Sequence, residues 1–247
     1  MNSVFVTGAN RGIGLEFVRQ LARRKPQPSH VFASCRNPRE AKELKALAAS
    51  NDNVHIVELD VQNEATYQPA VETVSRLVGE KGLSVLINNA GIYSTKSYED
   101  VSRELLTAIM DINVISPMRI TQAFLPLLRQ ASKRSTVKQF SFERAAVINI
   151  SSGYGSIAES TGGNAGYRES KAALNMFTKS LSLGLKKDHI LVTSLCPGWV
   201  QTDMGGPHAS RTPQDSVSSL LKICSQLSDK ENGVFLSNRL PISVNKF

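Results

Sequence analysis

Cysteine is scarce in this chain: Cys35, Cys196 and Cys224 are the three copies among 247 residues. They stand far apart and form no C-x-x-C pair, which argues against a disulfide framework, a metal site and a catalytic thiol. Widely spaced, reduced thiols are typical of cytosolic proteins. We therefore expect a cytoplasmic protein with no bound metal.

Long apolar runs are also absent, and no charged segment followed by an apolar one precedes the first strand-like run. Membrane spanning and secretion are therefore both disfavoured. The formal net charge is +8, but lysine and arginine are spread over the helical stretches, with a short cluster at 23–25 and a scatter over 129–138. This pattern favours solvated helix faces with some attraction for phosphorylated ligands, so we expect neither a nucleic-acid nor a membrane partner.

Strand-like and helix-like stretches alternate along the whole chain, which is typical of βαβ units on a parallel sheet. A chain of this length can bury an ample core in one domain. We expect a single α/β domain over residues 1–247, with a doubly wound parallel sheet of about seven strands and helices on both faces. The expected strands lie at about 2–7, 30–35, 54–59, 83–87, 145–150, 190–196 and 233–236, and the expected helices at about 12–24, 40–49, 64–78, 97–130, 212–227 and from 167 onward.

The first strand runs directly into a glycine-rich turn and then into an amphipathic helix. Glycines allow a positive φ and a close approach of the backbone, and a helix N-terminus offers free N–H groups to an anion. The stretch therefore favours a phosphate-binding loop, the alternative being an ordinary glycine-rich turn. Its residues are Thr7, Gly8, Ala9, Asn10, Arg11, Gly12, Ile13 and Gly14.

The fourth strand ends in Asn88-Asn89-Ala90-Gly91. Asparagine side chains fix neighbouring backbone in a turn, and alanine and glycine leave room for a flat ligand. In isolation this quartet is a turn. After a buried strand, in this order, it indicates the floor of a cofactor site.

Tyr167 and Lys171 stand one helical turn apart at the start of an apolar helix, so their side chains share a face. A free phenol has a pKa near ~10, and an adjacent ammonium is expected to bring it closer to neutrality. The pair is thus a candidate acid/base unit, although a lone Tyr-x-x-x-Lys is common on helices. Tyr154 lacks such support because Ala158 stands four residues on.

Taken together, the spacing Thr-Gly-x-x-x-Gly-x-Gly, the Asn-Asn-Ala-Gly quartet and the Tyr-x-x-x-Lys pair resemble the short-chain dehydrogenase/reductase family over nearly the whole chain. Details around Ser151, Ser152 and Tyr167 resemble its sniffer-like and C-factor-like carbonyl reductase branch. The resemblance implies a Rossmann-type fold. One departure is that Ser152 and Tyr167 are about two residues further apart than is usual, and residues 161–164 are expected to absorb the extra length.

The resemblance implies four catalytic residues: Asn113, Ser152, Tyr167 and Lys171. Tyr167 would act as the general acid, Ser152 would bind the substrate oxygen, and Lys171 would tune Tyr167 and hold the ribose. Pro117 has no N–H for the Asn113 carbonyl, which would then hold a water in a proton relay. The alternative for Pro117 is a simple kink in a long helix.

The end of the second strand reads Cys35-Arg36-Asn37, without the carboxylate that binds the ribose 2′-hydroxyl of NAD. Arg36 and Arg11 therefore favour NADP(H), the alternative for Arg36 being a surface cation. The resemblance implies that Asp60 binds the adenine; capping the next helix is a competing role, and the two are compatible. With the positions that the resemblance implies, the full expected cofactor set is Gly8, Asn10, Arg11, Gly12, Ile13, Gly14, Arg36, Asp60, Val61, Asn89, Ala90, Gly91, Tyr167, Lys171, Pro197, Gly198, Val200 and Thr202.

The stretch after the sixth strand resembles the start of a substrate lid, placed at about 198–218. Trp199, Met204 and Tyr93 are candidates for an apolar pocket, with buried packing as the alternative. The resemblance thus implies an NADP(H)-dependent carbonyl reductase of a ketone, aldehyde or quinone, most simply a homodimer or a tetramer. The competing hypothesis is a non-catalytic NADP(H) sensor on the same fold.

Overall fold

The computed structural model describes residues 1–238, and its strands form one sheet in the order β3-β2-β1-β4-β5-β6-β7. Every neighbouring pair is parallel. The predicted single α/β domain with a sheet of seven strands is therefore confirmed; residues 239–247 lie outside the described part. The strands are β1 (Ser3–Val6), β2 (His30–Cys35), β3 (Val54–Glu58), β4 (Val85–Asn88), β5 (Ala146–Ile150), β6 (Leu191–Leu195) and β7 (Phe235–Leu236).

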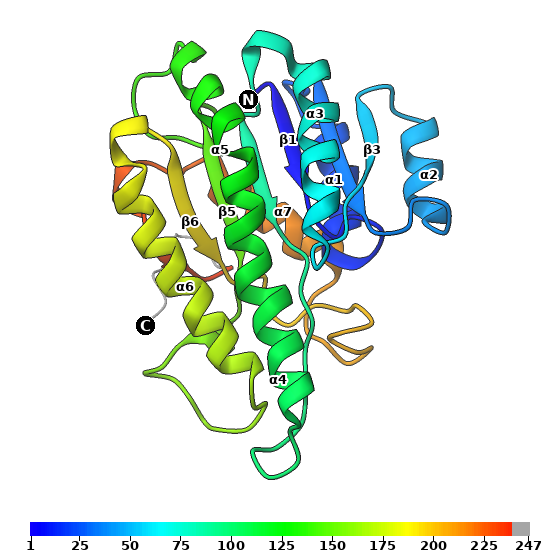
Figure 1. Cartoon of the computed structure of the whole chain (residues 1–247), viewed down its shortest axis with the longest axis vertical. Helices are drawn as coiled ribbons and strands as arrows, with labels where there is room; N and C mark the ends of the chain where they lie inside the picture. Colours follow the sequence, from blue (N-terminus) through cyan, green and yellow to red (C-terminus); the bar gives the residue numbers. More distant parts are fainter. Residues whose placement is uncertain (239–247) are drawn as a thin grey trace.

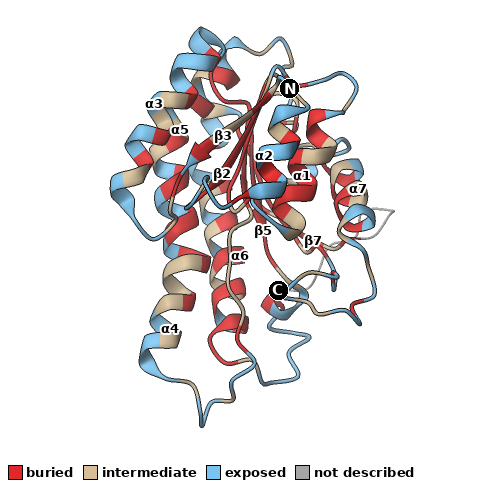
Figure 2. Ribbon diagram, turned by 90° about the vertical axis from the view of Figure 1, so that its right-hand side faces the viewer, coloured by how far each residue is buried: buried red, intermediate tan, exposed pale blue. Residues whose placement is uncertain are grey.

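Helices cover both faces of the sheet, and Figure 1 shows α5 and α6 lying across the nearer one. The strands are buried throughout most of their length and run red through the centre of Figure 2. On one face pack α1 (Gly12–Ala22), α2 (Lys42–Ala49) and α7 (Pro213–Cys224), and on the other α3 (Tyr67–Val78), α5 (Ser116–Arg134) and α6 (Tyr167–Gly184).

The alternation of side chains along β1 explains the two layers of core. Val4 and Val6 point to the α1 face, where they join Phe17 of α1. Phe5 points the other way and packs on Phe124 of α5, with ring centroids 4.5 Å apart. All five side chains are fully buried. Because helices cover both faces of the sheet, the central strand β1 carries apolar residues on both of its sides.

The helix predicted over 97–130 is instead divided into three parts. The hydroxyl of Ser102 accepts the N–H of Leu105 and caps α4 (Arg103–Met110), which therefore begins later than expected. A π-helical turn, η3 (Asp111–Ile115), follows and leads into α5. The long helical region is thus present over 103–134, and the π turn directly ahead of α5 distinguishes it from a simple proline kink.

The carboxyl ends of the strands gather the predicted motifs. β1 lies between β2 and β4 in the sheet. The connection after β1 therefore crosses one face of the sheet, and the connection after β4 crosses the other. A crevice forms at such a switch point outside the strand ends. The glycine loop follows β1, the Asn-Asn-Ala-Gly quartet follows β4, and the loops after β5 and β6 end at the same edge.

Candidate active site

In the glycine loop the backbone packs so closely that side chains would not fit at several positions. Gly8 and Gly12 have φ of +63° and +55°. A Cβ on Gly14 would lie 2.2 Å from the Gly8 carbonyl oxygen, so the first turn of α1 rests directly on the loop. Helix α1 begins after Arg11 without a side-chain cap, which leaves its first N–H groups for a ligand. This cradle fits the phosphates of a dinucleotide.

The quartet after β4 is tied to the same loop. The Thr7 hydroxyl accepts the N–H groups of Asn89 and Ala90 at 2.9 and 3.0 Å. The Asn89 amide donates back to the carbonyls of Thr7 and Gly8 at 2.9 and 3.2 Å. Asn89 therefore acts as a brace between β1 and β4, and Ala90 forms the surface beside Gly8. Sequence reasoning quoted Thr7 but missed its double role as acceptor.

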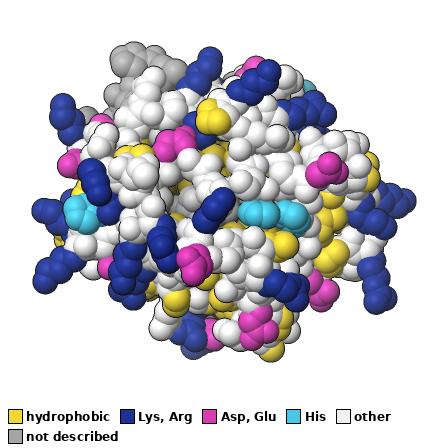
Figure 3. Space-filling model, turned by 90° about the horizontal axis from the view of Figure 1, so that it is seen from above, with side chains coloured by type: hydrophobic (Ala, Val, Ile, Leu, Met, Phe, Trp, Pro, Cys, Tyr) yellow, Lys and Arg dark blue, Asp and Glu magenta, His cyan; other side chains and the backbone are white. Residues whose placement is uncertain are grey.

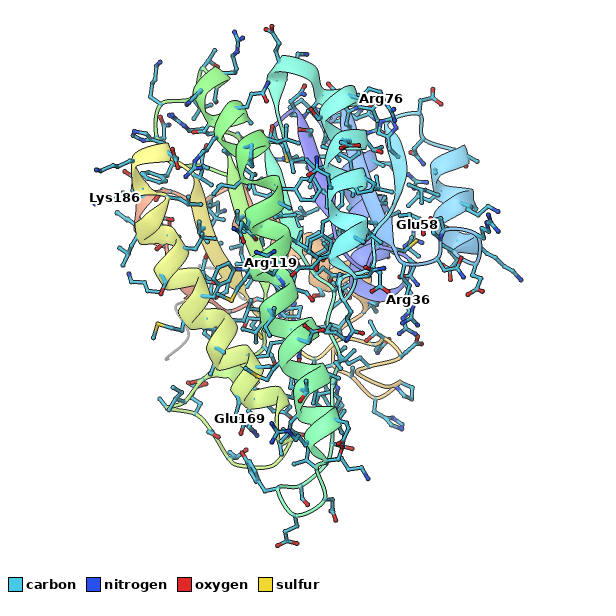
Figure 4. All side chains as sticks on the ribbon, viewed as in Figure 1. Arg36, Glu58, Arg76, Arg119, Glu169 and Lys186 are labelled. Atoms are coloured by element: carbon cyan, nitrogen blue, oxygen red, sulfur yellow. The ribbon has the colours of Figure 1, made fainter. Side chains whose placement is uncertain are left out.

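The two arginines proposed to select the cofactor are in different situations. Arg36 is exposed at the carboxyl edge, where Figure 4 labels it, and no described residue pairs with it. Arg11 instead forms an ion pair with Asp203 at 2.9 Å, with both side chains more than 70% exposed. Of these two arginines, Arg36 is the one without an ion pair among residues 1–238. Asn10 is exposed and Ile13 half-buried on the same rim.

Asp60 follows β3 and holds its own turn. Its carboxylate accepts the N–H of Gln62 at 3.0 Å. The following short helix is capped by Asn63, whose side chain accepts the N–H of Ala65. The expected capping role of Asp60 was therefore wrong, because three more residues separate it from the helix start. The carbonyl of the next residue, Val61, accepts the hydroxyl of Ser116 at 2.5 Å.

Asn113 lies in the π turn and is 1% exposed. Its side chain accepts the N–H of Ile92 and donates to the Ile92 carbonyl, both at 2.9 Å. It also donates to the hydroxyl of Ser170 at 3.0 Å. Ser170 in turn donates to the Tyr167 carbonyl, so Asn113 links the loop after β4 to the first turn of α6. Sequence reasoning did not single out Ser170.

Asn113 and Lys171 meet at Gly91, and Tyr167 joins them through its contacts with Lys171 and Ser152. A Cβ on Gly91 would lie 3.1 Å from Asn113 Oδ1 and 3.7 Å from Lys171 Nζ. Lys171 Nζ donates to the Ile150 carbonyl at 2.8 Å and lies 5.7 Å from the centre of the Tyr167 ring. The expected i, i+4 relation on α6 is present.

Burial dominates the electrostatics of this group. It raises the pKa of Tyr167, and a hydrogen bond with the Ser152 side chain opposes that rise. It also lowers the pKa of Lys171 to about 8, because the charged ammonium is removed from water. Desolvation of the phenolate is the largest influence on the pKa of Tyr167, and Lys171 is not among the groups that shift it. A phenol with a raised pKa stays protonated at neutral pH and can donate its proton.

The segment after β6 folds back on itself over the glycine loop. Val200 and Arg211 form a bridge, and Thr202 reaches the loop so closely that a Cβ on Gly12 would lie 3.2 Å from its Cγ2. Pro197 is tied to α7 through its carbonyl, which accepts the Ser216 hydroxyl at 2.8 Å. Helix α7 begins at Pro213, inside the expected lid segment 198–218.

Two of the expected pocket residues lie on the exposed side of this segment. Trp199 and Met204 are 57% and 46% exposed, so buried packing does not describe them. Gly198, at φ +79°, turns the chain beneath Arg211. Cys196 accepts N–H groups from Gly153 and Gly198 through its sulfur.

Within residues 1–238, no group of three histidine, cysteine, aspartate or glutamate side chains is arranged to hold a metal ion. Over the same residues no helix combines the length and apolar character needed to cross a membrane. On the face shown in Figure 3, lysine and arginine side chains are spread around the molecule with acidic side chains among them.

Comparison with known proteins gives a consistent result. The family model described as short chain dehydrogenase matches residues 2–212. An uncharacterized oxidoreductase of Schizosaccharomyces pombe is 35% identical over 251 residues, covering 94% of this chain and 93% of the relative.

Solved structures agree over the full length. The carbonyl reductase Sniffer of D. melanogaster superimposes with a TM-score of 0.97 at 39% identity and covers 100% of both chains. An NADPH-bound carbonyl reductase from chicken fatty liver gives a TM-score of 0.93 at 41% identity over 99% of each chain.

Proposed function

Since this chain belongs to the short-chain dehydrogenase family and is built like the Sniffer-type carbonyl reductases, we propose that it is an NADP(H)-dependent reductase of ketones, aldehydes or quinones. The observation that carries the proposal is the meeting of Asn113 and Lys171 at Gly91, one turn of α6 from Tyr167 and directly beside the glycine loop. A proton donor and a dinucleotide cradle thus share one edge of the sheet.

The loops at that edge hold the cofactor. The free N–H groups at the start of α1 bind the diphosphate, and the exposed guanidinium of Arg36 binds the 2′-phosphate. Asp60 and Val61 border the adenine, and Lys171 holds the nicotinamide ribose. When bound, the reduced nicotinamide supplies the hydride. The other contributing residues are Gly8, Asn10, Arg11, Gly12, Ile13, Gly14, Asn89, Ala90, Gly91, Tyr167, Pro197, Gly198, Val200 and Thr202.

Tyr167 delivers the proton. Its raised pKa keeps the phenol protonated, and Ser152, hydrogen-bonded to it, orients the substrate oxygen toward the same hydroxyl. Lys171, whose pKa burial lowers to about 8, is suited to passing a proton toward Tyr167. The Asn113 carbonyl, which receives no N–H from Pro117, holds the relay water.

Turnover distinguishes this proposal from an NADP(H) sensor. Purified protein is incubated with NADPH and a panel of quinones, aldehydes and ketones, and NADPH oxidation is followed by absorbance. Oxidation that depends on both protein and carbonyl is the expected result. Saturable NADPH binding with no oxidation on any member of the panel would contradict the reductase and favour the sensor.

We further propose a homodimer in the cytoplasm, with the outer faces of α5 and α6 as the contact. Large apolar side chains are exposed there, with Met176 and Leu183 on α6 at 66% and 63% and Met118 on α5 at 43%. Sedimentation should give a dimer for the native chain and a shift toward monomer for Leu183→Lys. A native monomer at micromolar concentration would contradict this assembly.

A further inference from the structure

The ring of Tyr167 packs against two other tyrosine rings. Tyr93, from the loop after β4, lies edge-to-face at 4.8 Å between centroids and an interplanar angle of 88°. Tyr154, from the short helix after β5, lies at 6.2 Å and 86°. Edge-to-face packing is the favourable arrangement of aromatic pairs. The proton donor therefore has two aromatic neighbours, both packed edge-to-face.

Each outer ring is held by a residue at the start of α6: Asn164 in the loop just before it, or Arg168 in its first turn. The Tyr93 hydroxyl donates to Asn164 Oδ1 at 2.8 Å. The guanidinium carbon of Arg168 lies 4.3 Å from the centre of the Tyr154 ring, a cation–π contact. The tyrosine that sequence reasoning set aside for want of a lysine partner thus has an arginine partner instead.

Arg168 is itself held in place. It is 8% exposed, donates from Nε to the Gly163 carbonyl at 3.1 Å and donates from Nη2 to the Thr161 hydroxyl at 3.0 Å. Asn164 has φ +53°, a left-handed conformation that asparagine tolerates well. Residues 161–164, which were expected to absorb the two extra residues, therefore support both rings: Asn164 directly and the others through Arg168.

The two loops are also joined to each other. The N–H of Ala165 donates to the Lys96 carbonyl at 3.0 Å, and the Tyr98 hydroxyl donates to Glu169 at 2.5 Å. Figure 4 labels Glu169 at the first turn of α6, beside these loops. This side of the site is a fixed wall. The opposite side, residues 199–211, carries the exposed Trp199 and an exposed ion pair to the glycine loop.

We propose that Tyr93 and Tyr154 determine substrate specificity by favouring a carbonyl carried on a planar ring over one on a saturated ring of equal size. Asn164 and Arg168 are the positioning residues that hold these two rings. The inference rests on the proposed reductase activity. Tyr93 is half-buried and Tyr154 is 40% exposed, so both keep surface for a substrate that reaches the Tyr167 hydroxyl. A rigid aromatic wall gains most from a flat partner, because neither side has to be ordered on binding.

Benzaldehyde and cyclohexanecarbaldehyde form a matched substrate pair, because they differ in planarity and little in size. The measured quantity is kcat/KM for benzaldehyde divided by kcat/KM for cyclohexanecarbaldehyde, both with saturating NADPH. In Tyr154→Leu this ratio should fall roughly 2- to 10-fold, the range expected for one aromatic contact. Tyr154→Phe, which keeps the ring beneath Arg168, should keep the wild-type ratio. The dissociation constant for NADPH and the melting temperature check that each variant is folded.

The positioning role has its own readout. Arg168→Ala should raise KM for benzaldehyde more than it lowers kcat, and Arg168→Lys should recover only part of the effect, since lysine keeps the charge but not the planar fork. Tyr93→Phe should lower the ratio less than Tyr93→Leu.

An unchanged ratio in both Tyr154→Leu and Tyr93→Leu would overturn the inference while leaving the reductase activity intact. A wild-type protein that binds NADPH and reduces no carbonyl would instead contradict the proposed function, and the inference with it.

Discussion

Asn113 and Ile92 form a reciprocal pair of hydrogen bonds, in which the side-chain amide of Asn113 matches both the N–H and the carbonyl of Ile92 at 2.9 Å. The pair fixes the loop after β4 against the π turn. Because Gly91 precedes Ile92, it also fixes the point at which Lys171 approaches.

Asn113→Leu should therefore reduce the free energy of unfolding by about 2–4 kcal/mol, since it leaves the half-buried backbone groups of Ile92 and the buried hydroxyl of Ser170 without this partner. Urea denaturation measures the change. Ser170→Ala, which removes only one bond to Asn113, serves as the comparison and should cost about 1 kcal/mol. Equal losses in the two variants would show that the Ile92 contacts contribute nothing.

Gly14→Ala should prevent NADPH binding and destabilise the fold by about 3 kcal/mol or more, because its Cβ would overlap the Gly8 carbonyl and the Asn89 amide. Gly184, in the last turn of α6, is the matched control, since a Cβ there meets nothing within 4 Å. Gly184→Ala should raise stability by up to about 0.5 kcal/mol. Fluorescence titration with NADPH and thermal melting distinguish the two. A Gly14→Ala protein with native affinity would rule out the close-packed cradle.

Arg36→Ala should raise KM for NADPH by roughly 10- to 100-fold and leave KM for NADH nearly unchanged, because only NADPH carries the 2′-phosphate. Arg11→Ala should have the smaller effect, since Asp203 already pairs with Arg11. Steady-state kinetics with both cofactors provide the comparison. Parallel changes in the two KM values after Arg36→Ala would argue against selection by this residue.

His30 and His55 should make the fold less stable in mild acid. Their ring nitrogens lie 3.0 Å apart, and burial, followed by a neighbouring positive charge, lowers the pKa of each below its usual 6.5. The unfolded chain therefore takes up protons first, so stability is full above about pH 6.5 and falls as the pH drops below it. Urea midpoints from pH 8 to 5 measure this slope, which His55→Gln should flatten. An equal slope in native and variant proteins would exclude the pair as its source.

Local pattern was sufficient for the parts of the site that are continuous in sequence. Three such parts were predictable: the turn from β1 to α1, the quartet after β4 and the start of α6 at Tyr167. In each of them, neighbouring residues determine the glycine conformation, the burial of the strand or the helical spacing. The family resemblance supplied the order in which these pieces combine.

What the sequence did not predict depends on contacts between distant residues. Arg11 meets Asp203 across 192 positions, and Arg168 meets Tyr154 only because the loop between them folds back. The π turn before Pro117 and the raised pKa of Tyr167 likewise follow from packing and burial, which spacing alone does not encode.

The central claim is that Tyr167 donates the proton during carbonyl reduction, and Tyr167→Phe tests it most directly. The variant keeps the ring and loses only the hydroxyl, so NADPH should bind with unchanged affinity while kcat falls by at least about 100-fold. Single-turnover oxidation of bound NADPH with an excess of a reducible carbonyl measures the step itself. A Tyr167→Phe protein that oxidises NADPH at the native rate would contradict the mechanism.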